Sequence, residues 1–428
     1  MQIHAYGETD VGRSRGHNED SILVDHQLGL YAVCDGMGGH AAGEVASATA
    51  VAAIQRHVAA GSSVLYQFDG SQAACEAVEA LLRAAIQAAS AEVFDLGRTG
   101  QGKHGMGTTC IALLAIHGKG FMGHVGDSRM YLVRDRRLWQ LSEDHTFANE
   151  AIRNGMMSMA DAKASPWANM VTRGVGIQRS VAVDTLVFDI VENDTVLLCS
   201  DGLTTYVEDA HELSAMLGDP ELGKLPSKLI HVANERGGGD NISAVVVRGA
   251  PEMPARPDDT SRRVQVTTNL QTLRHIALFM DLGDAELVRV FNRFRPVDYP
   301  AGAAIIREGE SAESMFVLVE GDVRVSRAGK TLASLGRGAH FGEMGLLNQR
   351  PRTATVTATS AAHALVLDRG AFNDVLREDT GLAAKLLYKL AQILSLRLDE
   401  NIGLADTADQ AERKTKELGV LSPFRRRR

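Results

Sequence analysis

The sequence has little of what marks several common classes of protein, beginning with cysteine. Only four cysteines occur among 428 residues, and no two lie at the close spacing of a zinc site or a redox dithiol. Cys34, Cys110 and Cys199 lie within apolar runs, where a free thiol usually serves as a small core residue. These positions argue against catalysis by a thiol.

Long apolar runs and an excess of positive charge are also missing. The chain has no stretch of about 18 apolar residues, which a membrane-spanning helix needs, and its start, MQIHAYGETD, lacks the pattern of a secretory signal. The formal net charge of −8 argues against a protein that binds nucleic acid through its phosphates. We interpret the basic end, 425–428, as a short solvated tail. We therefore expect a cytoplasmic protein with neither membrane nor nucleic acid as a partner.

A length of 428 residues predicts two or three domains. The stretch 250–263, APEMPARPDDTSRR, is rich in proline and charge and interrupts the periodic pattern, as linkers do. The predicted order is a first domain at 1–249, a linker at 250–269, a second domain at 270–400 and a tail at 401–428.

The first domain alternates strands with helices. Ala-rich patterns predict helices at about 43–60 and 72–94. The segment 121–132, FMGHVGDSRMYL, has the pattern of a hairpin with Gly-Asp at its turn. Residues 145–181 are poor in strand pattern and rich in Met, Asn and Gly, which suggests a surface subdomain.

The second domain begins with a helix pair at about 270–294 and continues as short strands separated by glycines. This regular punctuation predicts a small all-β barrel or jelly roll. The glycines are Gly302, Gly309, Gly321, Gly329, Gly336 and Gly342. From about residue 371 the pattern is helical, with an apolar stripe that either packs within the domain or forms the seam of a homodimer. The stripe consists of Leu382, Leu386, Leu390, Ile393 and Leu394.

Carboxylates stand at the ends of predicted buried strands in the first domain. The apolar runs 30–34 and 196–200 lead into Asp35-Gly36 and Asp201-Gly202, and Asp240-Asn241 precedes a third apolar run. A carboxylate followed by glycine places oxygen ligands at the rim of a sheet, where the backbone can also approach a cation. The three aspartates therefore predict one metal site.

The full series of motifs in the first domain resembles the metal-dependent serine/threonine protein phosphatases of type 2C, in their bacterial branch, over residues 7 to about 247. The series runs DVGRSRGHNED (10–20), DGMGG (35–39), GTT (107–109), GDSR (126–129), SDG (200–202) and GDN (239–241). The resemblance implies an α+β fold in which two antiparallel sheets form a sandwich flanked by helices. It also implies a dinuclear metal site, because two hard cations can neutralise a phosphoryl group and supply hydroxide from bound water.

The resemblance also assigns the metal ligands, with Mn²⁺ or Mg²⁺ as the ions. Asp35 bridges two ions, the Gly36 carbonyl joins Asp35 on one of them, and Asp201 and Asp240 hold the other. Asp127 matches the aspartate that holds a third, weaker ion in bacterial members. The metal-bound water is the nucleophile.

Three further residues receive supporting roles in the same way. Arg15 matches the arginine that binds phosphate, a task suited to a planar guanidinium. Glu19 and Asp20 orient metal-bound waters from outside the ligand shell. The position where animal members carry a histidine, the proposed proton donor, is Met37 here, so the general acid stays open between His40 and a metal-bound water.

The second domain carries the segment FGEMGLLNQRPRTA at 341–354. With the preceding 299–325 it resembles cyclic nucleotide-binding domains, over about 273–398. The resemblance makes 341–354 the phosphate-binding cassette. Glu343 then accepts a hydrogen bond from the ribose hydroxyl, and Arg352 pairs with the cyclic phosphate.

Backbone groups near Gly342 and Ala354 complete the predicted anion contacts. Both bases are compatible with Thr353, since threonine occurs at this position in guanosine-selective domains and a small hydroxyl residue also occurs in bacterial adenosine-binding regulators. We favour cyclic AMP over cyclic GMP. Too few residues follow position 399 for the helix-turn-helix of a transcription factor.

These resemblances together imply a phosphoserine/phosphothreonine protein phosphatase regulated by cyclic nucleotide. Its partners are then phosphorylated proteins, with serine/threonine kinases as opposing enzymes by family analogy. Two alternatives stay open, a non-enzymatic sensor or scaffold, and a phosphatase whose second domain only docks or dimerises. Residues 145–181 match the variable flap of the family, and we expect them to influence substrate choice.

Overall fold

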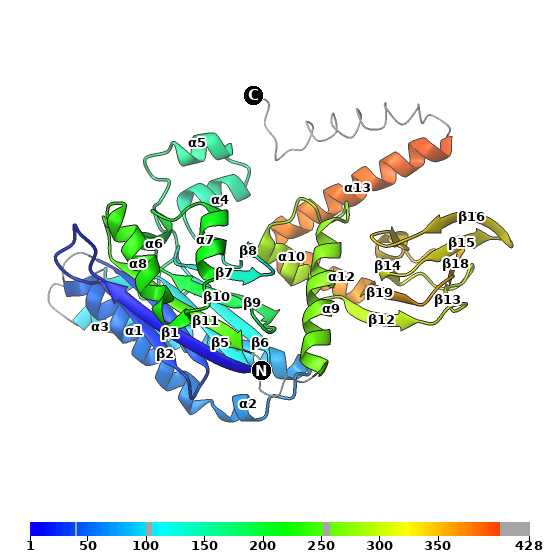
Figure 1. Cartoon of the computed structure of the whole chain (residues 1–428). Helices are drawn as coiled ribbons and strands as arrows, with labels where there is room; N and C mark the ends of the chain where they lie inside the picture. The colour runs from blue at the N-terminus through cyan, green and yellow to red at the C-terminus, as the bar shows by residue number, and fades with distance from the viewer. Residues whose placement is uncertain (39–40, 100–104, 251–256, 403–428) are drawn as a thin grey trace. The chain divides into compact units, whose positions relative to one another are not determined.

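The computed structural model describes the chain except for residues 39–40, 100–104, 251–256 and 403–428. The chain divides into two compact units, 1–263 and 264–428, and their elements are labelled in Figure 1. Within the described part, no helix is long and apolar enough to cross a membrane.

Unit 1 contains two antiparallel sheets. The five-stranded sheet has the order β1-β11-β10-β7-β8, formed by Gln2–Asp10, Ile242–Ala250, Thr195–Cys199, Arg129–Arg134 and Arg137–Gln140. The six-stranded sheet has the order β2-β3-β5-β6-β9 with β4 paired to β3. These strands are Asp20–Asp25 (β2), Leu30–Met37 (β3), Cys110–Ile116 (β5), Lys119–Val125 (β6), Asp184–Asp189 (β9) and Gly107–Thr108 (β4).

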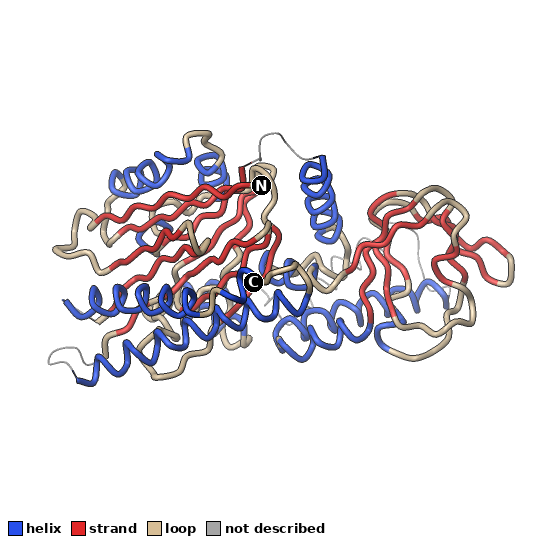
Figure 2. Tube along the Cα trace, turned by 90° about the horizontal axis from the view of Figure 1, so that it is seen from below, coloured by secondary structure: helices blue, strands red, loops and turns tan. Residues whose placement is uncertain are grey.

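Helices cover the outer face of each sheet in unit 1. One core joins the six-stranded sheet to α1 (Ala41–Ala60) and α3 (Gln72–Thr99), with α2 (Ser63–Tyr66) between them. A second core joins the five-stranded sheet to a group of shorter helices. These are α6 (Asp201–Thr204), α7 (Ala210–Leu217), the 3-10 turn Leu222–Lys224 and α8 (Leu225–Glu235). The layers of strands between helices are visible in Figure 2, and the predicted α+β sandwich is confirmed.

The predicted hairpin at 121–132 is wrong. β6 pairs only with strands of the six-stranded sheet, whereas β7 pairs with β10 and β8 of the other sheet. The turn between them therefore carries the chain from one sheet to the other, and Gly126 provides it with a φ of +106°. As a result, Asp127 lies where the two sheets meet.

The segment 145–181, named here the flap segment, has no regular strand among its described residues. It contains two short helices, α4 (Phe147–Arg153) and α5 (Met159–Lys163). Thr146 and Ser158 cap them, each accepting a hydrogen bond from a backbone N–H of the first turn. Isolated bridges from Thr146 to Val171 and from Thr108 to Val175 fix its two ends. The predicted surface subdomain thus has a fixed base.

Unit 2 contains two four-stranded antiparallel sheets, as predicted for a jelly roll, and its strands do not pair into one closed ring among the described residues. One sheet has the order β12-β19-β14-β17, formed by Arg295–Tyr299, Ala362–Asp368, Ser314–Glu320 and His340–Phe341. The other has the order β13-β18-β15-β16, formed by Ala304–Ile306, Thr355–Ala358, Val323–Arg327 and Lys330–Leu335. The helices are the later part of α9 (Pro257–Arg274), which begins in unit 1, with α10 (Asp284–Phe291), α11 (Met344–Leu347), α12 (Arg369–Glu378) and α13 (Thr380–Ile402).

Much of the predicted linker is helical. Helix α9 begins at Pro257 and runs through the boundary at residue 263, so only 251–256 of the proline-rich stretch lies outside the described residues. A proline in the first helical turn is compatible with a helix, because its missing N–H has no partner there in any case. Composition alone therefore placed the start of the second helical region too late.

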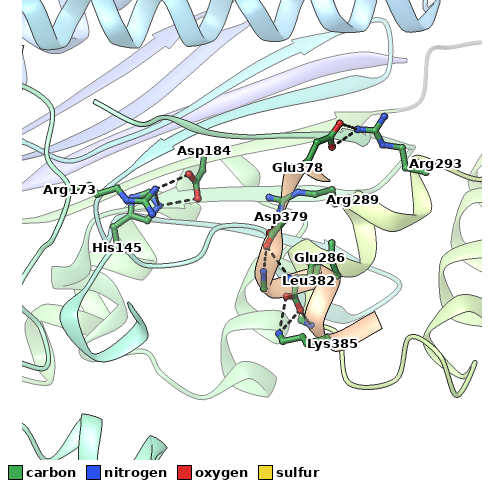
Figure 3. A network of polar contacts seen from close by, with 12 residues as sticks. His145, Arg173, Asp184, Glu286, Arg289, Arg293, Glu378, Asp379, Leu382 and Lys385 are labelled. Atoms are coloured by element: carbon green, nitrogen blue, oxygen red, sulfur yellow. Dashed lines mark hydrogen bonds and ion pairs between the residues drawn. The ribbon is translucent and has the colours of Figure 1, made fainter. Parts of the chain in front are cut away.

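The apolar stripe of α13 is largely internal. Leu382, Leu386 and Leu390 are buried. Lys385 and Lys389 of the same helix form ion pairs with Glu286 and Asp281, and the Lys385 pair is drawn in Figure 3. These contacts favour packing within the unit over a dimer seam for this part of the stripe.

Candidate functional site

Five aspartates of unit 1 form a group named here the acid cluster, consisting of Asp20, Asp35, Asp127, Asp201 and Asp240. Strand topology brings them together. β10 is an antiparallel neighbour of both β7 and β11, so its carboxyl end lies beside the starts of those strands. Asp201 follows β10, Asp127 precedes β7 and Asp240 precedes β11. The other two members lie on β2 and β3 of the second sheet.

Asp20 and Asp35 are direct partners across β2 and β3, an arrangement that is unfavourable for two negative charges. Oδ2 of Asp20 accepts hydrogen bonds from the hydroxyls of Ser200 (2.8 Å) and Ser243 (2.6 Å). Burial, with the charges of other members of the cluster, nevertheless raises the pKa of Asp20 to about 6. The two serine donors therefore offset only part of the unfavourable free energy of burying the charged carboxylate.

The rest of the cluster shows the same electrostatic conflict. Burial and the charges of four other aspartates raise the pKa of Asp35 well above its usual range. Burial, followed by the charge of Asp201, raises the pKa of Asp127 to about 7, and the pKa of Asp201 is also raised by burial and Asp240. Such a set of carboxylates lacks positive charge.

Unpaired oxygens lead to the same conclusion. Oδ1 of Asp20 and Oδ1 of Asp201 are buried without a hydrogen-bond partner among the described residues. Oxygen-rich, negatively charged and incompletely paired, the cluster fits hard divalent cations. The side chains do not stand in a finished coordination shell, since the described part of the chain holds no set of three or more His, Cys, Asp or Glu residues that could hold a metal ion. The fit thus rests on charge and unpaired oxygens.

Close backbone packing explains why glycine follows two of these aspartates. A Cβ on Gly36 would lie 2.2 Å from the carbonyl oxygen of Gly43, and one on Gly202 would lie 2.0 Å from that of Asn241. Any other residue would push the strand end away from its neighbour. The glycine of each Asp-Gly pair thus allows the strand end to pack closely against its neighbour, and it also leaves the backbone accessible to a ligand.

Arg15 lies at the rim of the acid cluster. Its Nη2 donates to Oδ2 of Asp240 at 2.7 Å, and half of its side chain, 50%, is exposed. The hydrogen bond and the charge of Asp240 raise the pKa of Arg15. A guanidinium in this place can turn toward an anionic substrate that approaches the cluster.

Asn241, whose role the sequence did not reveal, holds the loop that carries Arg15 and Glu19. Its Nδ2 donates to the carbonyls of Val11 and His17, both at 2.9 Å, and its Oδ1 accepts from the backbone N–H of Glu19 at 2.8 Å. The Asp-Asn pair was visible as a motif, but only the fold shows that its second residue fixes a segment more than 200 positions away.

A hydrogen-bonded group at the base of the flap segment contacts the turn of Asp127. The N–H of Gly126 donates to Nδ1 of His145 at 3.0 Å, and Nε2 of His145 lies 3.1 Å from Asp184. Arg173 donates to the same carboxylate at 3.0 Å (Figure 3). Burial raises the pKa of Asp184, but His145 and Arg173 outweigh it and the net shift is downward.

Arg129, the last residue of the GDSR motif, has a structural role. Its Nε and Nη2 form a bidentate pair with Asp144, the shortest contact being 2.7 Å. Met37 lies on β3, whereas His40, the candidate general acid, lies outside the described residues.

In unit 2 the structure brings together Gly342, Glu343 and Arg352 of the cassette. Gly342 has a φ of +80°, and its carbonyl accepts from Nη1 of Arg352 at 3.2 Å. Glu343 is buried beside them and its charge acts on Arg352. Thr353 is exposed and Ala354 half-buried.

The guanidinium of Arg352 binds neutral groups. Besides Gly342 it donates to the hydroxyl of Ser314 at 3.1 Å, and it lies 5.8 Å from the centre of the Phe316 ring. No carboxylate within ion-pair distance of it is found among the described residues. Burial and the nearby Arg369 lower the pKa of Arg352. The half-buried guanidinium of Arg352 thus has no ion-pair partner among the described residues, although the charge of Glu343 acts on it.

Known families match both units. The model of protein phosphatase 2C matches residues 12–221, and that of the cyclic nucleotide-binding domain matches residues 296–379. The serine/threonine phosphatase stp of Listeria monocytogenes is 36% identical over 249 residues, which are 57% of this chain and 95% of the relative. The serine/threonine protein phosphatase PstP of Mycobacterium tuberculosis is 34% identical over 238 residues, 56% of this chain and 43% of PstP.

Solved structures are similar over the same region. The crystal structure of the Mycobacterium tuberculosis phosphatase PstP/Ppp has a TM-score of 0.51 and 31% identity, covering 58% of this chain and 100% of that one. A structure of the PstP catalytic domain with two manganese ions has a TM-score of 0.50 and 31% identity, covering 58% and 98%. Because the Listeria monocytogenes phosphatase stp is 36% identical and is matched over 95% of its length, the chain belongs to the protein phosphatase 2C family of metal-dependent serine/threonine phosphatases.

Proposed function

We propose that this serine/threonine protein phosphatase hydrolyses phosphoserine and phosphothreonine at the acid cluster and that cyclic nucleotide bound to unit 2 changes its activity. The observation that carries the catalytic half is the group of aspartates at the strand ends whose pKa values are raised by burial and by one another's charges. Asp35 and the Gly36 carbonyl would hold one Mn²⁺ or Mg²⁺ ion and Asp201 with Asp240 the other, Asp35 being shared. Asp127 would hold a third, weaker ion.

When bound, two such ions supply a hydroxide nucleophile at neutral pH and neutralise phosphoryl oxygens. The protein's own residues do the rest. Arg15 leaves its contact with Asp240 and pairs with the phosphoryl group, which its exposure allows. Asp20, fixed by Ser200 and Ser243, and Glu19, fixed by Asn241, orient water at the ligand shell.

The regulatory half rests on Arg352. A half-buried guanidinium with neutral partners and a second guanidinium nearby is a site for an anion. A cyclic phosphate supplies one negative charge, and its ribose hydroxyl gives Glu343 a donor. We favour cyclic AMP over cyclic GMP, with the phosphoproteins that serine/threonine kinases produce as substrates.

The deciding experiment is a phosphopeptide assay of the full chain with Mn²⁺, without nucleotide and with cyclic AMP or cyclic GMP. We expect hydrolysis that Asp240→Asn abolishes and a nucleotide response that Arg352→Ala abolishes. Absence of hydrolysis with Mn²⁺ or Mg²⁺ would leave a non-enzymatic sensor. Hydrolysis with nucleotide binding but no change in rate would make unit 2 a docking or assembly module.

A further inference from the structure

Arg369, the first residue of α12, contacts the cassette although it lies 17 positions beyond Arg352 in the chain. Its Nε donates to the carbonyl of Gly345 at 2.7 Å, and its Nη2 donates to the carbonyls of Asn348, at 2.9 Å, and Ala312. Its own N–H donates to the carbonyl of Glu313 at 2.7 Å. One side chain thus binds carbonyls from two segments of unit 2.

Two of the carbonyls that Arg369 binds, those of Gly345 and Asn348, lie in a short helix and at its end. Helix α11 has only four residues, so the carbonyls of its last turn cannot all be satisfied within it. A planar guanidinium with five donors can bind several of them at once. Without Arg369, Gly345 and Asn348 would depend on water, and the path of the backbone after Glu343 would be free to change.

The opposite end of the same segment is held by Arg352. Its Nη1 donates to the Gly342 carbonyl, and a Cβ on Gly342 or Gly345 would lie 2.8 Å or 3.1 Å from that nitrogen. The cassette therefore stands between two arginines. Arg352 is the one assigned to the ligand, whereas the side chain of Arg369 donates to backbone carbonyls.

We propose that Arg369 is the positioning residue of the cassette, fixing α11 so that Glu343 and Arg352 are presented together to the ribose and cyclic phosphate. This inference rests on the proposed binding of cyclic nucleotide by unit 2. Arg369 contacts the part of the site that binds ribose and phosphate, which both nucleotides share. Its loss therefore lowers the affinity for cyclic AMP and for cyclic GMP by the same factor. It also joins the cassette to α12.

The test is calorimetry of the full chain with cyclic AMP and with cyclic GMP, on wild type, Arg369→Ala, Arg369→Lys and Arg377→Ala. Arg377 is the matched control, an arginine of the same helix with 80% of its side chain exposed. We expect Arg369→Ala to lower the affinity for both nucleotides about 10- to 100-fold, the size expected for loss of hydrogen bonds from a charged group. Arg369→Lys, which keeps the charge and fewer donors, should fall between, and Arg377→Ala should match wild type.

Hydrogen exchange of the ligand-free proteins separates positioning from general destabilisation. Faster exchange in Arg369→Ala confined to the amides of 342–348 supports the inference, and faster exchange throughout unit 2 overturns it. If Arg369→Ala does not fold, Arg369→Lys decides by the same two measurements. Wild-type affinity in a folded Arg369 variant overturns the inference alone, whereas no binding by the wild-type chain overturns the proposed sensor function and the inference with it.

Discussion

The two units present opposite electrostatic deficits. In unit 1, burial together with the charges of neighbouring aspartates raises the pKa of Asp20 to about 6 and that of Asp127 to about 7. In unit 2, burial and a second guanidinium lower the pKa of Arg352. Unit 1 therefore lacks positive charge among its buried carboxylates, which indicates cations, whereas Arg352 of unit 2 has no ion-pair partner among the described residues, which indicates an anion.

The two sites also differ in how they are fixed. The acid cluster is assembled from the ends of five strands in two sheets, and Asn241 and the serines tie these ends together. The cassette is one continuous segment, held by arginines that donate to its carbonyls. Changes in the acid cluster should therefore act on chemistry in an all-or-none manner, whereas changes around the cassette should act by degrees.

The largest effect is expected from Asp35→Asn. This change removes the carboxylate that interacts with four other aspartates but keeps its shape. Phosphopeptide hydrolysis should fall at least about a thousandfold, roughly 4 kcal/mol of barrier, while calorimetric binding of cyclic nucleotide stays at the wild-type value. Activity within about tenfold of wild type, or about 1.4 kcal/mol, would contradict the two-metal interpretation.

Removing the metal should reverse the pH dependence of stability. The folded pKa values of Asp20 and Asp127 lie above the ordinary value of 3.8, so without metal the folded state binds more protons than the unfolded state between about pH 4 and pH 7. The free energy of unfolding of the chelator-treated protein should therefore fall as pH rises through this window, by about 3 kcal/mol for Asp20 alone.

With saturating Mn²⁺ the same free energy should rise with pH, because metal ligands must be deprotonated. Urea unfolding at pH 5, 6.5 and 8, with chelator and with Mn²⁺, measures both slopes. Equal slopes under the two conditions would mean that the aspartates are not the metal-binding groups.

Much of the acid cluster could be predicted because its members lie in recognisable local sequence motifs. An apolar run that ends in Asp-Gly marks a strand end, and the order of several such motifs indicates a family. The Ser200 and Ser243 donors were not predicted, since a hydroxyl in or beside a strand is common and nothing in the sequence relates positions 200 and 243 to Asp20. The role of Arg369 was not predicted either, because its partners are backbone carbonyls of distant segments, which no sequence pattern relates to it.

Two features of the fold show where local patterns fail. The Gly-Asp pattern at 126–127 correctly indicated a turn, but a turn does not tell which sheet the next strand joins, and β7 crosses to the other one. Proline and charge at 257–263 suggested a linker, although both are compatible with the first turns of α9. In each case tertiary packing decides between local conformations that the sequence leaves nearly equal.

A moderate effect is expected from Arg15→Ala. Because the side chain is half exposed and its partner is a proposed metal ligand, its loss should reduce kcat/KM for phosphopeptides about 10- to 100-fold through the lost charged hydrogen bonds to phosphate. Asp240, freed of its ion pair, should bind metal as tightly as before or more tightly. Titration of activity with Mn²⁺ distinguishes a role in binding phosphate from a role in supporting the metal site. A weaker apparent affinity for Mn²⁺ with unchanged phosphopeptide kinetics would make Arg15 a structural residue.

The smallest effect is expected from the flap segment, which bears on how unit 1 selects among phosphoproteins. The charged groups of both sites read a phosphate, which all substrates share, so discrimination requires other contacts. The flap segment offers exposed apolar side chains of methionine and tryptophan, each about half exposed or more. These are Met156, Met159, Trp167 and Met170. Flexible thioethers and an indole suit varied apolar residues beside a phosphosite.

Trp167→Ala should therefore change kcat/KM by about threefold to tenfold among phosphopeptides with different neighbouring residues, the size that partial burial of one large apolar side chain provides. It should leave hydrolysis of para-nitrophenyl phosphate, which has no neighbouring residues, unchanged. Tyr66→Ala is the matched control, an 81% exposed aromatic residue outside the flap segment. Hydrogen exchange should show faster amides in α4 and α5 than at His145, whose ring and backbone are tied to Gly126. Equal protection of the flap segment and the sheet strands, together with an unaltered peptide preference, would show that selection among substrates arises elsewhere on unit 1.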